Sequence, residues 1–243
     1  MAKRPFLSLM PPGADDVSGV APTGASRTLI ERAYTQLRDD IVEGRLAPGE
    51  QLRVEHLKLR YDVSAGTLRE AITRLASDAL VVTEGQRGFR VAPIAADDLM
   101  DLTRLRVHIE IDALRQSMRE GGTAWREQLH AAYAELSKWE QPLRPDQARP
   151  WEKLNSAFHE ALLAGHASPW TVRLLRMLAR QSERYRRYAI NLPAGPRDVH
   201  AEHREIYESA IAGNELRASL ALEAHIRITA ELVARALSER QPA

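Results

Sequence analysis

Apolar residues recur at helical spacing from Thr28 onward and predict a first helix that ends at Gly44. Four of them lie four residues apart, on one helix face: Leu29, Ala33, Leu37 and Ile41. Before Thr28 the chain shows little apolar periodicity and holds several prolines and glycines. We therefore expect residues 1–26 to form a flexible arm.

Two further helices are predicted close together after the turn that follows Gly44. Residues 54–61 form the short second helix, and Ser64 is a favourable N-cap for the third. The third helix is expected to bury one stripe, made of Leu68, Ala71, Ile72 and Leu75. Only two residues separate these helices, which is typical of a helix-turn-helix.

Two short β-prone runs follow the third helix, over residues 80–83 and 89–92. The segment between them contains Gly85 and Gly88, which favour a tight connection. The pattern predicts a small hairpin, or wing. We therefore interpret residues 27–94 as a winged helix-turn-helix domain.

The second half of the chain has no convincing strand and shows a period of about 3.6 residues. Proline-containing breaks separate the apolar stretches. The pattern predicts six helices, over residues 97–119, 123–140, 150–165, 169–190, 197–212 and 214–238. The fold class is therefore mainly α, with an all-helical bundle over residues 95–240.

Composition limits the possible surroundings and partners of the chain. None of the 243 residues is cysteine, which excludes disulfides and thiolate metal sites. No apolar stretch approaches the roughly 20 residues that a membrane-spanning helix needs, so we expect a cytoplasmic protein without membrane contacts. The net charge of +1 does not by itself indicate nucleic-acid binding. The case for DNA must therefore depend on where the arginines lie.

The polar face of the third helix is suited to the major groove. Arg69 is the expected base-reading residue, because arginine can bond guanine O6 and N7 together. The wing offers Arg87 and Gly88 to the backbone or minor groove. Further expected contacts are Arg60, Ser64, Thr67 and Arg74. The alternative is a solvated polar face on an ordinary packing unit.

Three histidines lie on or beside the apolar stripes of separate predicted helices: His159, His203 and His225. Three imidazoles that converge from three helices can bind Zn²⁺ or a similar divalent ion and leave positions open for a ligand. Asn155 lies one turn before His159 on the same helix face. The alternative is that each histidine is a hydrogen-bonded core residue.

Arg106 falls on an apolar stripe, where a solvated charge is not expected. One interpretation is an ion pair with Glu110, one turn away. The other is a pocket arginine that grips a carboxylate effector with two hydrogen bonds. We also expect Arg184 and Tyr188 to line the cavity.

The run RLAPGEQLRVEHLKLRYDVSAGTLREAITRLASDALVVTEGQRGFRVAPI resembles the DNA-binding head of GntR-type regulators. The family phrase PG precedes the second helix, VS-x-x-x-x-RE opens the recognition helix, and RG-x-x-V forms the wing. This chain departs from the family in having Ala65 and Gly66 where Arg and Thr usually stand. The form SAGTLREA with GQRGFRV looks most like the CsiR-type branch, regulators of small dicarboxylate catabolism.

Residues 97–238 resemble the FCD effector domain of the FadR-type branch of this family. The phrases NSAFH, EHREIYESAIAGNE and EAHI place the three histidines at the metal-ligand positions of that domain. Asn155 stands where the family has Asp, and its neutral amide oxygen is a weaker ligand for a hard divalent ion. The resemblance thus implies a divalent metal such as zinc, and the substitution of Asp by Asn leaves weakened or absent binding as the alternative.

These observations together predict a homodimeric, sequence-specific DNA-binding regulator, a repressor controlled by a small carboxylate effector. No catalytic residue is expected. One alternative is a metal-dependent hydrolase in the helical domain, although no partner carboxylate for acid/base work is evident. The other is a DNA-binding structural protein in which Arg106 and the histidines only support packing.

Overall fold

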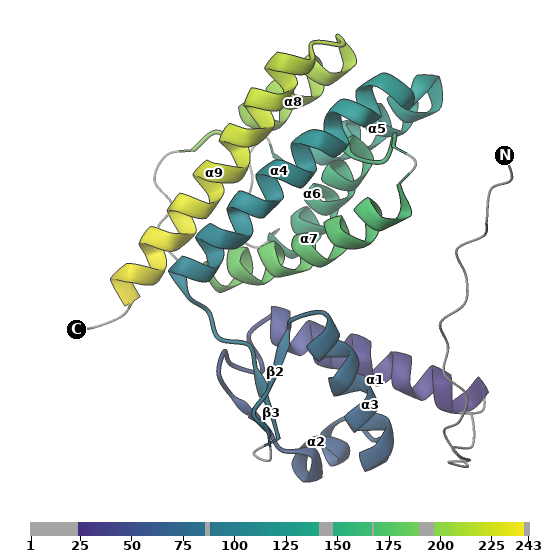
Figure 1. The fold of residues 1–243 in the computed structure, drawn as a ribbon, viewed down its shortest axis with the longest axis vertical. Helices are drawn as coiled ribbons and strands as arrows, with labels where there is room; N and C mark the ends of the chain where they lie inside the picture. The colour runs from purple at the N-terminus through teal and green to yellow at the C-terminus, as the bar shows by residue number, and fades with distance from the viewer. Residues whose placement is uncertain (1–23, 86–87, 141–147, 167, 190–196, 241–243) are drawn as a thin grey trace, which may run out of the picture.

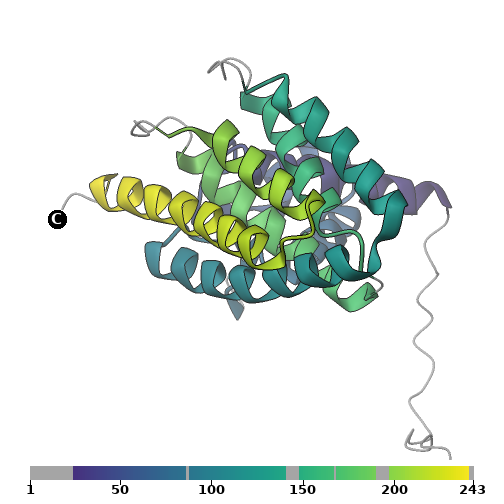
Figure 2. The same cartoon turned by 90° about the horizontal axis from the view of Figure 1, so that it is seen from above.

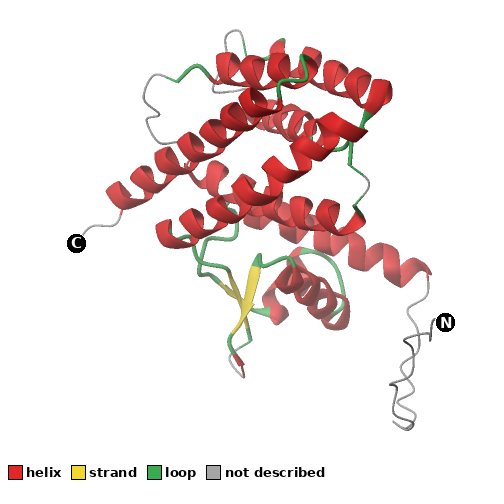
Figure 3. Cartoon of the chain, turned by 45° about the horizontal axis from the view of Figure 1, so that its top comes forward, coloured by secondary structure: helices red, strands yellow, loops and turns green. Residues whose placement is uncertain are grey.

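The computed structural model describes residues 24–85, 88–140, 148–166, 168–189 and 197–240. These residues form a small N-terminal head and a larger helical bundle (Figure 1). Among the described residues, strands occur only in the head (Figure 3). No described helix has the length and apolar character that crossing a bilayer requires.

The head is a winged helix-turn-helix, as predicted. Its helices are α1 (Gly24–Val42), α2 (Val54–Arg60) and α3 (Ala65–Ser77), and its strands are β1 (Gln51–Leu52), β2 (Val81–Thr83) and β3 (Phe89–Val91). Both β1 and β2 pair antiparallel with β3, which lies between them. The sequence pattern missed β1, because two residues are too few to show an alternation of apolar and polar positions.

The predicted stripe of α3 forms the centre of the head core. Leu68, Ala71, Ile72 and Leu75 are fully buried against apolar residues of α1 and the sheet. The Ser64 hydroxyl accepts the Thr67 backbone N–H at 3.1 Å, which caps α3 as expected. The helix α1 begins at Gly24, inside the predicted arm of residues 1–26. An apolar pattern does not record where hydrogen bonding begins at a helix end.

The bundle contains all six predicted helices. They are α4 (Ala96–Glu120), α5 (Gly122–Ser137), α6 (Ala148–Leu162), α7 (Pro169–Ala189), α8 (Val199–Ile211) and α9 (Glu215–Arg240). Their ends differ from the predicted ones by three residues or fewer. The two longest helices, α4 and α9, run alongside each other (Figure 2).

Two apolar clusters hold the bundle together. The larger one joins α4, α5, α6, α8 and α9 and includes the fully buried Phe158, Leu162 and Leu222. The smaller one packs Tyr185 of α7 against Leu99 of α4 and the C-terminal half of α9. Because α6, α8 and α9 share the larger cluster, their inward-facing polar side chains are held close together.

Replacing Leu68 by Ala is expected to lower the free energy of unfolding of the head by about 2–5 kcal/mol, because it leaves a cavity in a close-packed core. Native-state hydrogen exchange of the amides in α1 and α3 measures this loss separately from the bundle. Leu59 is 78% exposed, so Leu59→Ala is the matched control and should change the value by no more than about 0.5 kcal/mol. Equal effects of the two substitutions would contradict this assignment of the core.

Candidate DNA interface and candidate metal centre

The polar face of α3 is open to solvent. The Arg69 guanidinium is exposed and makes no hydrogen bond or ion pair with any residue that the structure describes, while the Arg69 backbone oxygen accepts from the Thr73 hydroxyl at 2.9 Å. Ser64 is also exposed and Thr67 is half-buried, and their hydroxyls are hydrogen-bonded to each other at 2.9 Å. The guanidinium of Arg69 is therefore available to a duplex, while Ser64 and Thr67 already share one hydrogen bond at the start of the helix.

The other predicted arginines of the head are engaged within it. Arg60 donates to the buried Asp40 at 2.5 Å, and Tyr61 donates to the same carboxylate at 2.6 Å. Arg74 pairs with Glu31 of α1 at 2.9 Å. Both arginines remain exposed, so they can reach DNA only by leaving or sharing these partners.

The wing is described in part. Gly88 has a φ of +89°, a backbone conformation that side chains disfavour, and no atom would meet a Cβ there within 4 Å. This open, left-handed position fits the tip of a wing. Arg87, the predicted charged contact, lies outside the described residues.

The three predicted histidines meet inside the bundle. One ligating nitrogen from each of His159 (α6), His203 (α8) and His225 (α9) lies within 4.8 Å of the others. His203 is fully buried, and the ring centroids of His203 and His225 are 4.7 Å apart. Helices distant in the sequence thus bring three imidazoles to one point.

Two carboxylates, the buried Glu140 and the half-buried Glu202, orient the rings. His203 Nδ1 bonds Glu140 Oε1 at 2.8 Å, and His225 Nδ1 bonds Glu202 Oε2 at 2.8 Å. A carboxylate that accepts the Nδ1 proton leaves the lone pair of a neutral ring on Nε2. His203 Nε2 is buried and has no hydrogen-bond partner among the described residues. The lone pair of His203 Nε2 is therefore available to a Lewis acid such as a metal ion.

Two more buried atoms at the cluster lack a hydrogen-bond partner in the described part of the chain: His159 Nδ1 and Asn155 Oδ1. Buried polar atoms without partners are rare, and each one costs about 1–3 kcal/mol. The unpartnered atoms of His203, His159 and the cavity-lining Asn155 are thus nitrogen and oxygen acceptors of the types that bind a divalent ion. The residues therefore fit the metal that the sequence implied, with Asn155 offering the amide oxygen of a weaker fourth ligand.

The environment keeps two of the imidazoles neutral. Burial lowers the pKa of His159 and of His225 well below the usual value of 6.5, and the neighbouring histidines lower both pKa values further. The guanidiniums of Arg106 and Arg186 act in the same direction. Neutral imidazole is the form that binds a metal, so protons compete little for these nitrogens near pH 7.

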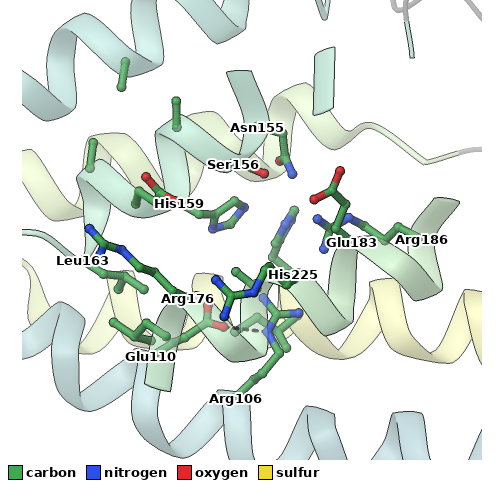
Figure 4. A pocket seen from close by; sticks show the side chains of 18 of the residues that line it. Arg106, Glu110, Asn155, Ser156, His159, Leu163, Arg176, Glu183, Arg186 and His225 are labelled. Carbon is green, nitrogen blue, oxygen red and sulfur yellow. Dashed lines mark hydrogen bonds and ion pairs between the residues drawn. The ribbon is translucent and has the colours of Figure 1, made fainter. Parts of the chain in front are cut away.

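A cavity of about 740 Å³ adjoins the histidines. His159, His225 and Asn155 line it, together with guanidiniums from α4 and α7 (Figure 4). Arg106 Nε donates to Glu110 Oε1 at 2.6 Å, and both side chains are on the cavity wall. Arg106 is therefore paired with Glu110 and also lies on the cavity wall, while its role in gripping a carboxylate effector stays a prediction.

Arg184 does not line this cavity, and that expectation is corrected. The residue is 3% exposed and donates to the backbone oxygens of Ala92 at 3.0 Å and Pro93 at 2.7 Å. It therefore holds the connection between head and bundle. Its position on α7 alone could not show this, because the partners lie about 90 residues away. The side chain of Tyr188 lies outside the described residues.

The sequence analysis missed the carboxylates that support the site. Glu140 and Glu202 hold the histidine rings, and Glu152 pairs with Arg186 on the cavity wall. A metal-ligating histidine generally donates its second N–H to an acceptor, so such partners were to be expected. Nothing in the spacing distinguishes these glutamates from the many solvated ones.

Comparison with known proteins agrees with this architecture. The model described as "Bacterial regulatory proteins, gntR family" matches residues 29–91, and the FCD domain model matches residues 101–228. The HTH-type transcriptional regulator BphR of Paraburkholderia xenovorans is 42% identical over 87% of this chain and 88% of its own. The HTH-type transcriptional repressor GlaR of Escherichia coli is 28% identical over 84% of this chain and 96% of its own.

Solved structures share the fold. The structure of Escherichia coli McbR/YncC aligns with a TM-score of 0.70 and 17% identity, over 88% of this chain and 99% of that one. A GntR regulator from Rhodococcus aligns with a TM-score of 0.69 and 22% identity, over 88% of this chain and all of that one. The chain therefore belongs to the GntR family of bacterial regulatory proteins, as a DNA-binding transcriptional regulator whose helical half is an FCD domain.

Proposed function

We propose that this regulator is a homodimeric repressor whose operator affinity is controlled by a small organic acid, bound beside a divalent metal in the FCD domain. The observation that carries the proposal is the histidine cluster on the wall of a cavity lined with arginines. The similarity to GlaR, a transcriptional repressor, supports the direction of control. Two heads related by twofold symmetry would read the two halves of a palindromic operator.

The site residues divide into two groups. His159, His203 and His225 would hold the metal, with Asn155 as a weaker fourth ligand. A metal bound there supplies open coordination positions for a carboxylate oxygen. Arg106 would grip the same carboxylate, and its pairing with Glu110 holds the guanidinium in place beforehand. The acid binds one conformation of the FCD domain more tightly than the other. It therefore favours the spacing of the two heads that goes with that conformation.

We propose binding rather than turnover at this site. Among the described residues, the two carboxylates nearest the histidines, Glu140 and Glu202, are bonded to imidazole Nδ1 atoms. Glu110 on the cavity wall is paired with Arg106. None of these carboxylates is available as the general base that a metal-dependent hydrolase requires.

Arg69→Ala is expected to weaken binding to an operator selected from a random duplex pool by about 1–3 kcal/mol and to relax its sequence preference. The reason is that Arg69 is the exposed, unpaired guanidinium of the recognition face. Dimerisation and metal content should not change. The control is Arg217→Ala near the start of α9, which removes an exposed arginine from the bundle. Unchanged operator affinity in Arg69→Ala would remove this residue from the interface.

His203→Gln is expected to abolish stoichiometric metal in the purified protein, because it removes a ligand whose Nε2 has no other partner. Elemental analysis and the rise in Tm on adding Zn²⁺ measure this effect. His108→Gln removes an exposed histidine and should behave as wild type. Conversely, Asn155→Asp should raise metal affinity by about tenfold or more by adding a charged ligand. Metal content that is equal in all four proteins would contradict the site.

Arg106→Lys is expected to reduce the rise in Tm that small carboxylates produce in the metal-loaded protein. Lysine keeps the positive charge beside Glu110 but cannot form the two parallel hydrogen bonds of a guanidinium. A thermal-shift screen of mono- and dicarboxylates, with and without chelator, measures the effect. At a ligand concentration of 100 times Kd the wild-type stabilisation is about 2.7 kcal/mol. If no acid raises the Tm of the wild type, the proposed effector class is wrong.

A further inference from the structure

The helix α7 has one set of side chains on the effector cavity and another on the DNA-binding head. Arg176, Ala179, Glu183 and Arg186 recur at helical spacing and line the cavity. Gln181 and Arg184 instead donate to backbone oxygens of the head and of the connection. In Figure 1, α7 is the bundle helix that lies next to α1. A single rigid element therefore contacts both functional parts.

Asp78 is the point at which α7 holds the recognition helix. It is the C-cap of α3, and its carboxylate accepts from Arg180 Nη2 of α7 at 2.6 Å and from the Tyr34 hydroxyl of α1 at 2.5 Å. Its backbone oxygen accepts from Gln181 Nε2 at 2.7 Å. The next residue, Ala79, has a φ of +57°, so the chain turns sharply at this point. The end of α3 is thus fixed by three hydrogen bonds from two other helices.

Arg180 contacts both the recognition helix and the effector cavity. Its Nη2 donates to Asp78 at the end of α3. The same side chain lines the 740 Å³ cavity and a second cavity of about 550 Å³ between α1, α6 and α7. Its Nε–H is buried and has no acceptor among the described residues. Arg38 of α1 lines both cavities as well, so the head contributes to the wall of the effector site.

The chemistry of the guanidinium sets up a competition. A carboxylate that binds arginine bidentately uses two N–H groups on one edge, such as Nε and Nη2. Asp78 uses only Nη2 of Arg180 and leaves Nε unsatisfied. A carboxylate arriving from the cavity can bond both groups, and it therefore competes with Asp78 for the Arg180 guanidinium.

We propose that Arg180 is a second contact for the effector, and that a bound acid whose far end presents a carboxylate draws Arg180 away from Asp78 and loosens the recognition helix. This inference rests on the proposed acid-binding function. The ligand that it specifies is a bifunctional acid, with one carboxylate near Arg106 and the histidines and an oxygen acceptor at the head side of the cavity. In this proposal Arg180 exchanges its ion-pair partner Asp78 for the carboxylate of the effector.

The ligand-free part of the proposal is tested by operator titrations with Asp78→Asn, Arg180→Gln and the double variant. Each is expected to lower operator affinity by about 5- to 150-fold, the range of a typical coupling between two sites. The double variant should be no weaker than the single ones, because all three remove the same ion pair. Arg173→Gln is the control, since Arg173 lies on α7, stacks on Trp170 and lines neither cavity. Wild-type affinity in both single variants would overturn the proposal.

The ligand-dependent part uses unbranched acids of four to eight carbons in two matched series, the alkanoates and the corresponding α,ω-dicarboxylates. In the wild type, the dicarboxylate of the best length should lower operator affinity at least tenfold more than its alkanoate. Arg180→Gln should remove that difference while keeping the Arg106-dependent rise in Tm, which also shows that the variant is folded.

The outcomes separate this inference from the proposed function. If alkanoates and dicarboxylates act equally, and Arg106→Lys weakens both, the effector site is correct and the role of Arg180 is wrong. If no acid of either series binds the metal-loaded protein, the proposed function fails, and this inference fails with it.

Discussion

The helical domain depends on one constraint, the convergence of three imidazoles, two buried and one half-buried, whose ligating nitrogens lie close together. The nitrogens lie within 4.8 Å of one another, and burial lowers the pKa of His159 and of His225, which favours the neutral form of these two. Buried acceptors without partners cost about 1–3 kcal/mol each, so an apolar core would be more stable at this point. Two carboxylates, Glu140 and Glu202, accept hydrogen bonds from Nδ1 of His203 and His225 and so orient these rings. The arrangement fits a ligand shared by the three imidazoles.

The position of this cluster links it to DNA binding. Its neighbours on the cavity wall include side chains of α7, and the same helix bonds the end of the recognition helix and the connection at Ala92 and Pro93. Tyr185 of α7 also donates to Asp98 at the start of α4 at 2.5 Å. The helix α7 is therefore joined to the head and to the connection by short polar contacts.

Sequence patterns predicted the helices and two of the three strands that the structure describes, β2 and β3. The α3 stripe, the N-cap at Ser64 and the six bundle helices follow from local periodicity and capping, which depend on neighbours in the chain. The convergence of His159, His203 and His225 came from the resemblance to the FCD domain, since spacing alone left core histidines as an alternative. The family models confirm that resemblance.

What could not be predicted depends on partners far apart in sequence. The role of Arg184 is set by carbonyls about 90 residues away, and Asp78 meets Arg180 across 102 residues. Glu140 and Glu202 look like ordinary surface glutamates until the helices pack. The short strand β1 is defined by its pairing with β3 rather than by any pattern of its own. Tertiary contacts of this kind decide which charged residue supports a site and which is solvated.

X-ray absorption spectroscopy of the metal in the purified, full-length protein tests the central claim most directly. The account predicts a shell of three imidazole nitrogens, at about 2.0–2.1 Å if the metal is zinc, completed by oxygen ligands. A spectrum with no imidazole scattering, or a protein that cannot be loaded with any divalent metal, would contradict it.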